Sequence, residues 1–256
     1  MTSVTGRVRL ALHGQVAQVI LSHPGKFNAM SRAMWRELRS VFVELQGRAD
    51  VRCVIVAGEG GHFCAGGDIA EYPDFRFGEA DLRDFHEDDV WNGLDAMLAC
   101  DVPLLAQIEG NCMGAGVEIA SCCDIRVASV SARFGAPIAK LGFPMAPREA
   151  ALVAREAGAA TAREMLLEAA VFDATEMKAR GFLNTVLPDG TLTSAVLARA
   201  QRVCALSPQA ARLNKQTLRA AQDATSATAD GAYRYANSAE HREGIAAFLA
   251  KRPAVF

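Results

Sequence analysis

Residues 108–120 read IEGNCMGAGVEIA, and this stretch decides the fold because it joins a strand to a helix through a glycine-rich turn. The apolar run 102–108 before it predicts a buried strand, and the residues from Val117 onward are compatible with a short helix. Glycine in the turn lets another molecule approach the backbone closely. The unpaired N–H groups at the start of a helix can bind an anionic oxygen.

Glu118 lies three residues after Ala115, about one helical turn further on, so the two should share one face. A helix side chain leans back towards the N-terminus, so this carboxylate should overhang a backbone N–H that can bind an oxyanion. The flanking Val117 and Ile119 predict a partly buried carboxyl group with a raised pKa. The alternative interpretation of Glu118 is an exposed helix residue or a structural ion pair.

The composition predicts a soluble globular protein with a large core. Of 256 residues, 51% are hydrophobic and 22% are charged, and the net charge of −2 excludes a global basic field for nucleic acid or an anionic membrane. Seven cysteines without C-x-x-C spacing indicate buried reduced thiols and no metal site. Residues 1–6 lack the features of a signal peptide, and no apolar run is long enough to span a membrane. We therefore expect a cytoplasmic protein.

The order of predicted elements is a repeated ββα-like plan, although no literal sequence repeat is present. We expect strands at 8–12, 16–21, 51–57, 102–108, 124–128 and 183–187. We expect helices after Ser31 as N-cap and at 82–98, 147–157, 162–169, 174–179, 192–206, 208–220 and a last one ending near Leu249. Residues 72–80 read as a loop. We place a boundary near residue 190, with a core at 1–190 and a helical region at 191–256 that packs on its own core or on a neighbouring subunit.

Several motifs in a fixed order resemble the crotonase superfamily, also called the enoyl-CoA hydratase/isomerase family. A lone Gly-x-Gly would be weak evidence, but the resemblance covers nearly the whole chain. The matching segments are KFNAM at 26–30, FCAGGD at 63–68, residues 110–120 with CD at 123–124, FGAP at 134–137 and GIAAFLAKRP at 244–253.

The resemblance implies an α/β fold, a crotonase-like spiral of ββα repeats with a C-terminal helical trimerisation region. It also implies a homotrimer or a dimer of trimers and a coenzyme A thioester substrate, with no cofactor beyond that coenzyme A. Matched residue by residue, the backbone N–H groups of Gly67 and Ala115 would hold the thioester oxygen, and Glu118 would be the acid/base. The residues implied to contact the substrate or its coenzyme A are Lys26, Ala29, Ala65, Gly66, Gly67, Asp68, Ile69, Gly114 and Ala115.

Each of these residues also has a purely structural interpretation. The glycines could form ordinary tight turns, and Lys26 could be a solvated lysine. Asp68 could cap a short helix into Ile69 and Ala70. The resemblance, by contrast, implies that Lys26 lies near the phosphates of coenzyme A. It also implies that Ala29, Ala65 and Ile69 lie near the adenine and pantetheine of coenzyme A.

One departure from the family pattern concerns proton transfer. Family hydratases carry a second glutamate directly after the Phe-Gly-x-Pro run, and Ile138 stands there in this sequence. Isoleucine cannot transfer a proton, so another group must protonate the α-carbon. Glu149, Glu71 and His62 are candidates, but nothing in the sequence places them at the thioester. The sequence therefore predicts an enoyl-CoA hydratase-like enzyme. The alternatives are a coenzyme A thioester isomerase, decarboxylase or hydrolase, and a non-catalytic acyl-CoA-binding protein.

Overall fold

The main sheet begins with a hairpin, β1 (Arg7–His13) and β2 (Val16–Ser22), at the place where the sequence predicts it. Gly14 occupies the turn with a φ of +61°, a conformation that favours glycine. The computed structural model describes residues 5–222 and 233–256. Residues 1–4, which belong to the segment 1–6 discussed above as lacking the features of a signal peptide, lie outside the described residues.

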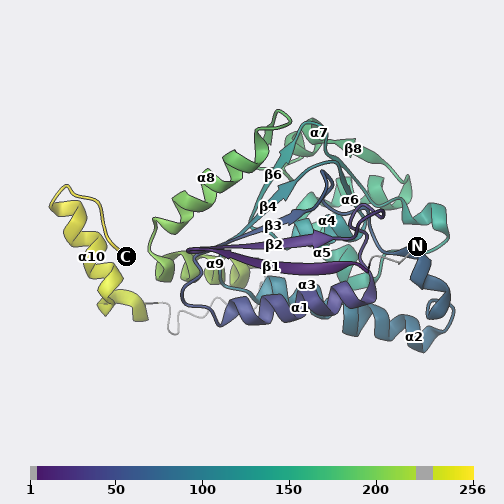
Figure 1. Ribbon diagram of the computed structural model, residues 1–256, viewed down its shortest axis with the longest axis horizontal. Helices are drawn as coiled ribbons and strands as arrows, with labels where there is room; N and C mark the ends of the chain where they lie inside the picture. Colours follow the sequence, from purple (N-terminus) through teal and green to yellow (C-terminus); the bar gives the residue numbers. More distant parts are fainter. Residues whose placement is uncertain (1–4, 223–232) are drawn as a thin grey trace.

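Four more strands extend this sheet in the order β1-β2-β3-β4-β6-β9, and every pairing after the hairpin is parallel (Figure 1). They are β3 (Cys53–Gly58), β4 (Leu104–Ile108), β6 (Ile125–Ser129) and β9 (Thr185–Leu187). A second sheet, β5-β7-β8, consists of β5 (Asn111–Met113), β7 (Arg133–Gly135) and β8 (Val171–Asp173). These three short strands were not predicted, unlike β9, which lies within the predicted strand 183–187.

Helices cover both faces of the main sheet, and the alternation of side chains explains why. Along β3, Val54 and Val56 belong to the larger core, which contains α1 (Arg32–Gln46) and α3 (Asn92–Ala99). Cys53 and Ile55 face the opposite way and form a smaller core with α8 (Leu192–Cys204). Figure 1 shows α8 on one side of the sheet and α1 and α3 on the other. The predicted cap of α1 is confirmed, because the Ser31 hydroxyl accepts a hydrogen bond from Met34 N at 3.2 Å.

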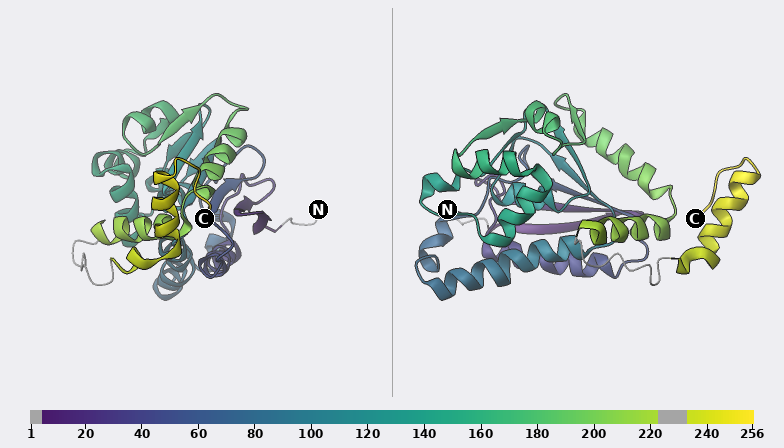
Figure 2. Two further views of the ribbon diagram at one scale, coloured as in Figure 1. Left: turned by 90° about the vertical axis from the view of Figure 1, so that its left-hand side faces the viewer. Right: turned by 180° about the vertical axis from the view of Figure 1, so that it is seen from behind.

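Further helices are α4 (Ala115–Ser121), η3 (Pro137–Leu141), α5 (Pro147–Ala157), α6 (Ala159–Leu167), α7 (Ala174–Ala179), α9 (Pro208–Gln222), η4 (Arg234–Asn237) and α10 (Ala239–Leu249). The α-helices among them follow the predicted positions to within a few residues, whereas the short 3₁₀ helices η3 and η4 were not predicted. Figure 2 shows α10 standing away from the body of the chain. The division at residue 190 stays a prediction. None of the helices in the described ranges has the length and apolar character needed to cross a membrane.

The segment 69–99 differs from its predicted form. The expected loop 72–80 begins within a 3₁₀ helix, η1 (Ile69–Asp74), that accommodates Pro73. The expected single helix 82–98 is three consecutive pieces: α2 (Glu79–Asp84), the π-helix η2 (Phe85–Trp91) and α3. π-Helical turns are rare and occur frequently at functional sites.

Candidate active site

The two glycine-rich loops are joined by backbone hydrogen bonds. Cys64 N donates to Asn111 O and Met113 N donates to Cys64 O, each at 2.8 Å, which forms a parallel bridge between the loops. Met30 N in turn donates to Gly66 O at 2.8 Å. Segments far apart in the sequence are therefore held in register around positions 64–67 and 112–115.

Glycines allow this close approach. A Cβ on Gly116 would lie 2.6 Å from the carbonyl oxygen of Cys64, so only glycine fits there without a shift of backbone. Gly66 and Gly114 have φ values of +111° and +48°, which L side chains rarely adopt. A Cβ on Gly114 would lie 3.6 Å from Gly66 Cα, so the two turns lie against each other.

A cavity of about 260 Å³ opens where these loops meet. Its lining includes seven of the residues predicted for the site: Ala65, Gly66, Gly67, Ile69, Gly114, Ala115 and Glu118. Lys26, Ala29 and Asp68 do not line it. The elements that close it are α1, η1, η2, η3 and the segment 141–146.

The backbone N–H groups of Gly67 and Ala115 donate no hydrogen bond to any atom in residues 5–222 and 233–256. Buried backbone donors are almost always paired; Ala115 is buried and Gly67 is partly buried, so two unpaired amides on one cavity wall are candidates for binding an external acceptor. The hydroxyl of Tyr72 lies against Gly67, and a Cβ at position 67 would collide with it. An acceptor bound by Gly67 N would therefore be near a phenol as well.

Glu118 is 8% exposed and lines the same cavity, and none of the hydrogen bonds formed in the described ranges involves its side chain. Burial, followed by the charge on Glu149, raises the pKa of Glu118 to about 8. A carboxyl group in this state can take or give a proton near neutral pH. The prediction of a buried carboxyl with raised pKa is confirmed.

Lys26 and Asp68 form an ion pair, with 2.6 Å between Lys26 Nζ and Asp68 Oδ2. Asp68 is buried and also caps η1, because its Oδ1 accepts a hydrogen bond from Ala70 N at 3.3 Å. The cap predicted for Asp68 is confirmed. Ala29 is buried; its N–H donates to Lys26 O at 3.0 Å, and its carbonyl lies 2.7 Å from His23 Nδ1.

Ile138 lies on η3 and lines the cavity, so the second position of the family pattern is apolar in the folded protein. Of the three substitutes considered from sequence, Glu149 is 2% exposed and lies close enough to Glu118 to raise its pKa. Glu71 accepts a hydrogen bond from Arg32 N at 2.8 Å and lies outside the cavity lining. His62 accepts one from Asn111 N at 3.1 Å and supports the loops.

The opposite wall of the cavity comes from residues 72–76, from η2 and from the segment 141–146. Arg76 stacks on Phe143 and on Tyr72, with its Cζ 3.7 and 4.5 Å from the ring centroids. Burial raises the pKa of Tyr72 to about 12 and lowers that of Arg76. Phe85 and His86 from η2 complete this wall. No motif marks these side chains, because tertiary packing alone assembles them.

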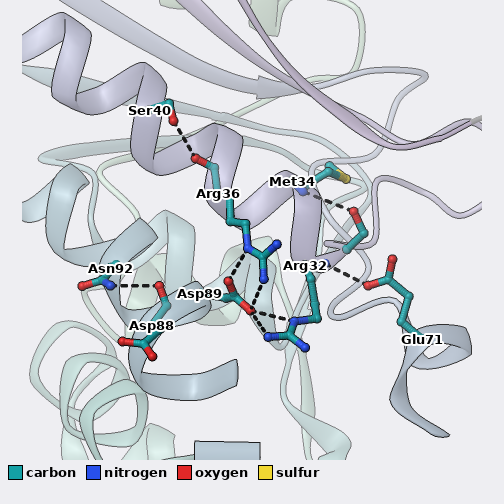
Figure 3. A network of polar contacts seen from close by, with 9 residues as sticks. Arg32, Met34, Arg36, Ser40, Glu71, Asp88, Asp89 and Asn92 are labelled. Atoms are coloured by element: carbon teal, nitrogen blue, oxygen red, sulfur yellow. Dashed lines mark hydrogen bonds and ion pairs between the residues drawn. The ribbon is translucent and has the colours of Figure 1, made fainter. Parts of the chain in front are cut away.

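Asp89 fixes η2 against α1 (Figure 3). Its buried carboxylate accepts hydrogen bonds from Arg32 Nε at 2.7 Å and from Arg36 Nε at 2.6 Å. Because Asp89 faces α1, its neighbours His86 and Val90 can line the cavity. The network therefore sets the orientation of the π-helix at the site.

Metal ligation finds no support in the part of the chain that the structure describes. No group of three or more histidine, cysteine, aspartate or glutamate side chains there could hold an ion. The seven cysteines are buried free thiols, and none forms a disulfide. This agrees with the expectation of reduced core cysteines.

Known proteins are similar to this chain in sequence and in fold. Residues 12–256 match the family model described as enoyl-CoA hydratase/isomerase. A probable enoyl-CoA hydratase of Mycobacterium bovis is 31% identical over 249 residues, which cover 94% of each chain. A mitochondrial Δ(3,5)-Δ(2,4)-dienoyl-CoA isomerase of Dictyostelium discoideum is 29% identical and covers 94% of this chain and 87% of its own. The crystal structure of an enoyl-CoA hydratase/carnithine racemase from Magnetospirillum magneticum superposes with a TM-score of 0.94 at 35% identity, covering 99% of this chain and 96% of that one.

Proposed function

The chain belongs to the enoyl-CoA hydratase/isomerase family, and from that premise we propose that it adds water across the α,β double bond of an enoyl-CoA thioester. The backbone N–H groups of Gly67 and Ala115 hold the thioester oxygen, and Glu118 acts on the water. One observation carries this proposal: two amides that lack an acceptor in the described chain line the same cavity as a buried carboxyl group.

The proposed chemistry uses each of these groups once. Water gives a proton to the Glu118 carboxylate while the water oxygen attacks the β-carbon. The electron pair of the double bond moves through the α-carbon to the thioester oxygen, which forms an enolate. Two preoriented N–H donors stabilise that oxyanion more than they stabilise the ground-state carbonyl. In other enzymes the loss of one such donor raises the barrier by about 2.7–4 kcal/mol.

Coenzyme A would lie across the outer side of the loops. We propose Lys26, which is paired with Asp68 and 41% exposed, near the phosphates. Ala29, Ala65 and Ile69 would contact the adenine and pantetheine, with Gly66 and Gly114 beside the thioester. The apolar side chains of the cavity suit a hydrocarbon acyl group. The reaction needs no cofactor beyond the coenzyme A of its substrate.

Ile138 also leaves room for other functions, because it removes the second carboxyl group that family hydratases carry. A site with one carboxyl group at the thioester also suits an isomerase, a decarboxylase or a hydrolase in which Glu118 moves the proton. A crotonase-like protein that binds acyl-CoA without turnover is the alternative from another class. The dienoyl-CoA isomerase among the relatives supports the first of these.

We also propose a cytoplasmic homotrimer or dimer of trimers. Helix α10 supports assembly, because Ile245, Phe248 and Leu249 are 54%, 81% and 75% exposed. Contiguous exposed apolar side chains commonly mark a protein interface.

The test follows the loss of crotonyl-CoA absorbance with the wild type and with Glu118→Gln. We expect hydration by the wild type and a loss of at least about a hundredfold in the variant, because an amide cannot accept the proton. Glu168→Gln is the matched control, since Glu168 is exposed and outside the cavity. Tight acyl-CoA binding without any turnover would favour the binding protein, and full activity of Glu118→Gln would refute the assigned role.

A further inference from the structure

The cavity lining contains three titratable side chains besides Glu118: Tyr72, Arg76 and His86. Burial raises the pKa of Tyr72 to about 12, so its hydroxyl keeps its proton. Arg76 stays a cation, because guanidinium groups do not lose their charge in proteins. Imidazole is the only one of these three side-chain types that ordinarily exchanges a proton between pH 5 and 8.

His86 is held by a buried carboxylate. Its Nδ1 lies 3.1 Å from Glu149 Oε1, and Glu149 reaches it from α5. Glu149 is 2% exposed, and its second oxygen has no hydrogen-bond partner in the described residues. A carboxylate at Nδ1 fixes the hydrogen on that nitrogen, which makes Nε2 the proton-exchanging atom. Nε2 forms no hydrogen bond within residues 5–222 and 233–256.

Two contacts besides the one with Glu149 hold His86 in position. The π-helix η2 carries it, and Asp89 on the same helix is anchored to Arg32 and Arg36 of α1. The ring of Phe85 packs on the imidazole at 5.0 Å between centroids. A firmly held side chain on the wall of the cavity is one condition for efficient proton transfer, and His86 meets it.

We propose that His86, positioned by Glu149, is the second proton-transfer residue of this site and supplies the proton that Ile138 cannot supply. The inference rests on the proposed hydration. As water adds to the β-carbon and Glu118 takes its proton, the imidazolium Nε2–H protonates the α-carbon and the enolate collapses to the thioester carbonyl. The proton on Glu118 then returns to His86 through solvent, since the His86 side chain is 21% exposed, and the net reaction adds one water.

Two assays separate the proposed roles. The first is hydration of crotonyl-CoA, and the second is exchange of the α-hydrogens of butyryl-CoA with D₂O, followed by NMR. Exchange requires the α-carbon acid/base and the amides, but no water addition. We expect His86→Ala to lose about 10²–10⁴-fold in both assays. Glu118→Gln should lose hydration but lose less exchange than His86→Ala. His13→Gln, an exposed histidine on β1, should leave both unchanged.

Two further readouts distinguish chemistry from folding. Added imidazole should restore activity to His86→Ala in proportion to its concentration, whereas pyrrole, which has the same shape without a basic nitrogen, should not. Glu149→Gln can still accept the Nδ1–H bond but lacks the charge, so we expect kcat to fall about tenfold or more with KM little changed.

Each contrary outcome has a distinct meaning. If the wild type hydrates crotonyl-CoA while His86→Ala keeps its exchange rate within about threefold, the role of His86 is refuted and the proposed function stands. If Glu118→Gln loses exchange and His86→Ala keeps it, Glu118 serves the α-carbon and the inference is wrong. If the wild type neither hydrates nor exchanges, the proposed function fails and this inference fails with it.

Discussion

Gly116 and Cys64 pack so closely that a Cβ on Gly116 would lie 2.6 Å from the Cys64 carbonyl oxygen. This contact joins the start of α4 to the other glycine-rich loop. It therefore sets the spacing between the two loops that carry Gly67 and Ala115. The consequences for stability can be tested separately from catalysis.

Gly116→Ala should destabilise the fold, because the added methyl group meets rigid backbone. We expect a loss of about 1–3 kcal/mol in the free energy of unfolding, measured in urea. Gly47→Ala is the matched control: Gly47 has a φ of −79°, and a Cβ there would lie 3.5 Å from Glu44 O, an ordinary contact. Equal stability of the two variants would show that the loops have room to separate.

Glu118 should make stability depend on pH. Its pKa is raised to about 8, above its ordinary value of 4.5, so the folded chain holds this proton more tightly than the unfolded chain. Between these values only the unfolded form releases the proton, and stability falls as pH rises. Glu118→Gln should remove this loss of stability at high pH, because glutamine does not ionise.

Urea unfolding of Glu118→Gln and wild type at several pH values measures that loss. One pKa unit corresponds to about 1.4 kcal/mol, so we expect the advantage of the variant to grow by on the order of 2–4 kcal/mol between pH 5 and pH 9. Glu168→Gln should show no such trend. A pH-independent difference would mean that Glu118 ionises as readily in the folded protein as in water.

Asp89→Asn should affect both stability and turnover, because it leaves Arg32 and Arg36 without their shared carboxylate. We expect a loss of about 1–3 kcal/mol, below the 3–5 kcal/mol of a fully buried pair, since both arginines are partly exposed. Displacement of η2 should also lower kcat. Asp88→Asn is the control, because Asp88 is exposed on the same helix. Unchanged turnover in Asp89→Asn would show that the ion pairs of Asp89 with Arg32 and Arg36 are not needed to position the active site.

Lys26→Ala should weaken substrate binding and spare the chemical step. Its ammonium group is partly exposed beside Asp68 and is proposed to meet the coenzyme A phosphates. We expect KM to rise severalfold with kcat nearly unchanged, and the effect to shrink at high salt. A change in kcat alone would place Lys26 elsewhere in the mechanism.

Phe248→Asp should disrupt the proposed assembly, because a charge in an apolar contact is not tolerated without a partner. Light scattering after size exclusion would then give a smaller mass than for the wild type. Arg163→Asp, a charge change at an exposed position of α6, which Figure 1 shows at the opposite end of the molecule from α10, is the comparison. A wild-type mass of one chain would contradict the proposed trimer.

The long elements could be predicted because their signals are local. β2 and β3 are apolar runs that are almost wholly buried, and Ser31 marks the start of α1. The resemblance to a known family then placed Glu118 and both glycine-rich loops at one site, and the structure brings the loops together.

The other half of the site has no local signal. His86 and Glu149 are 63 positions apart and meet only through tertiary packing. The π-helical register of η2 depends on contacts between Asp89 and α1, which hydrophobic periodicity does not encode. For the same reason the three-residue strands β5, β7 and β8 were not predicted.

The most direct test of the central claim is a crystal structure of the protein with a bound acyl-CoA. We predict the thioester oxygen within about 2.7–3.1 Å of both Gly67 N and Ala115 N, with the Glu118 carboxyl beside the α- and β-carbons. A thioester bound in the cavity with its oxygen out of reach of either amide would contradict the proposal.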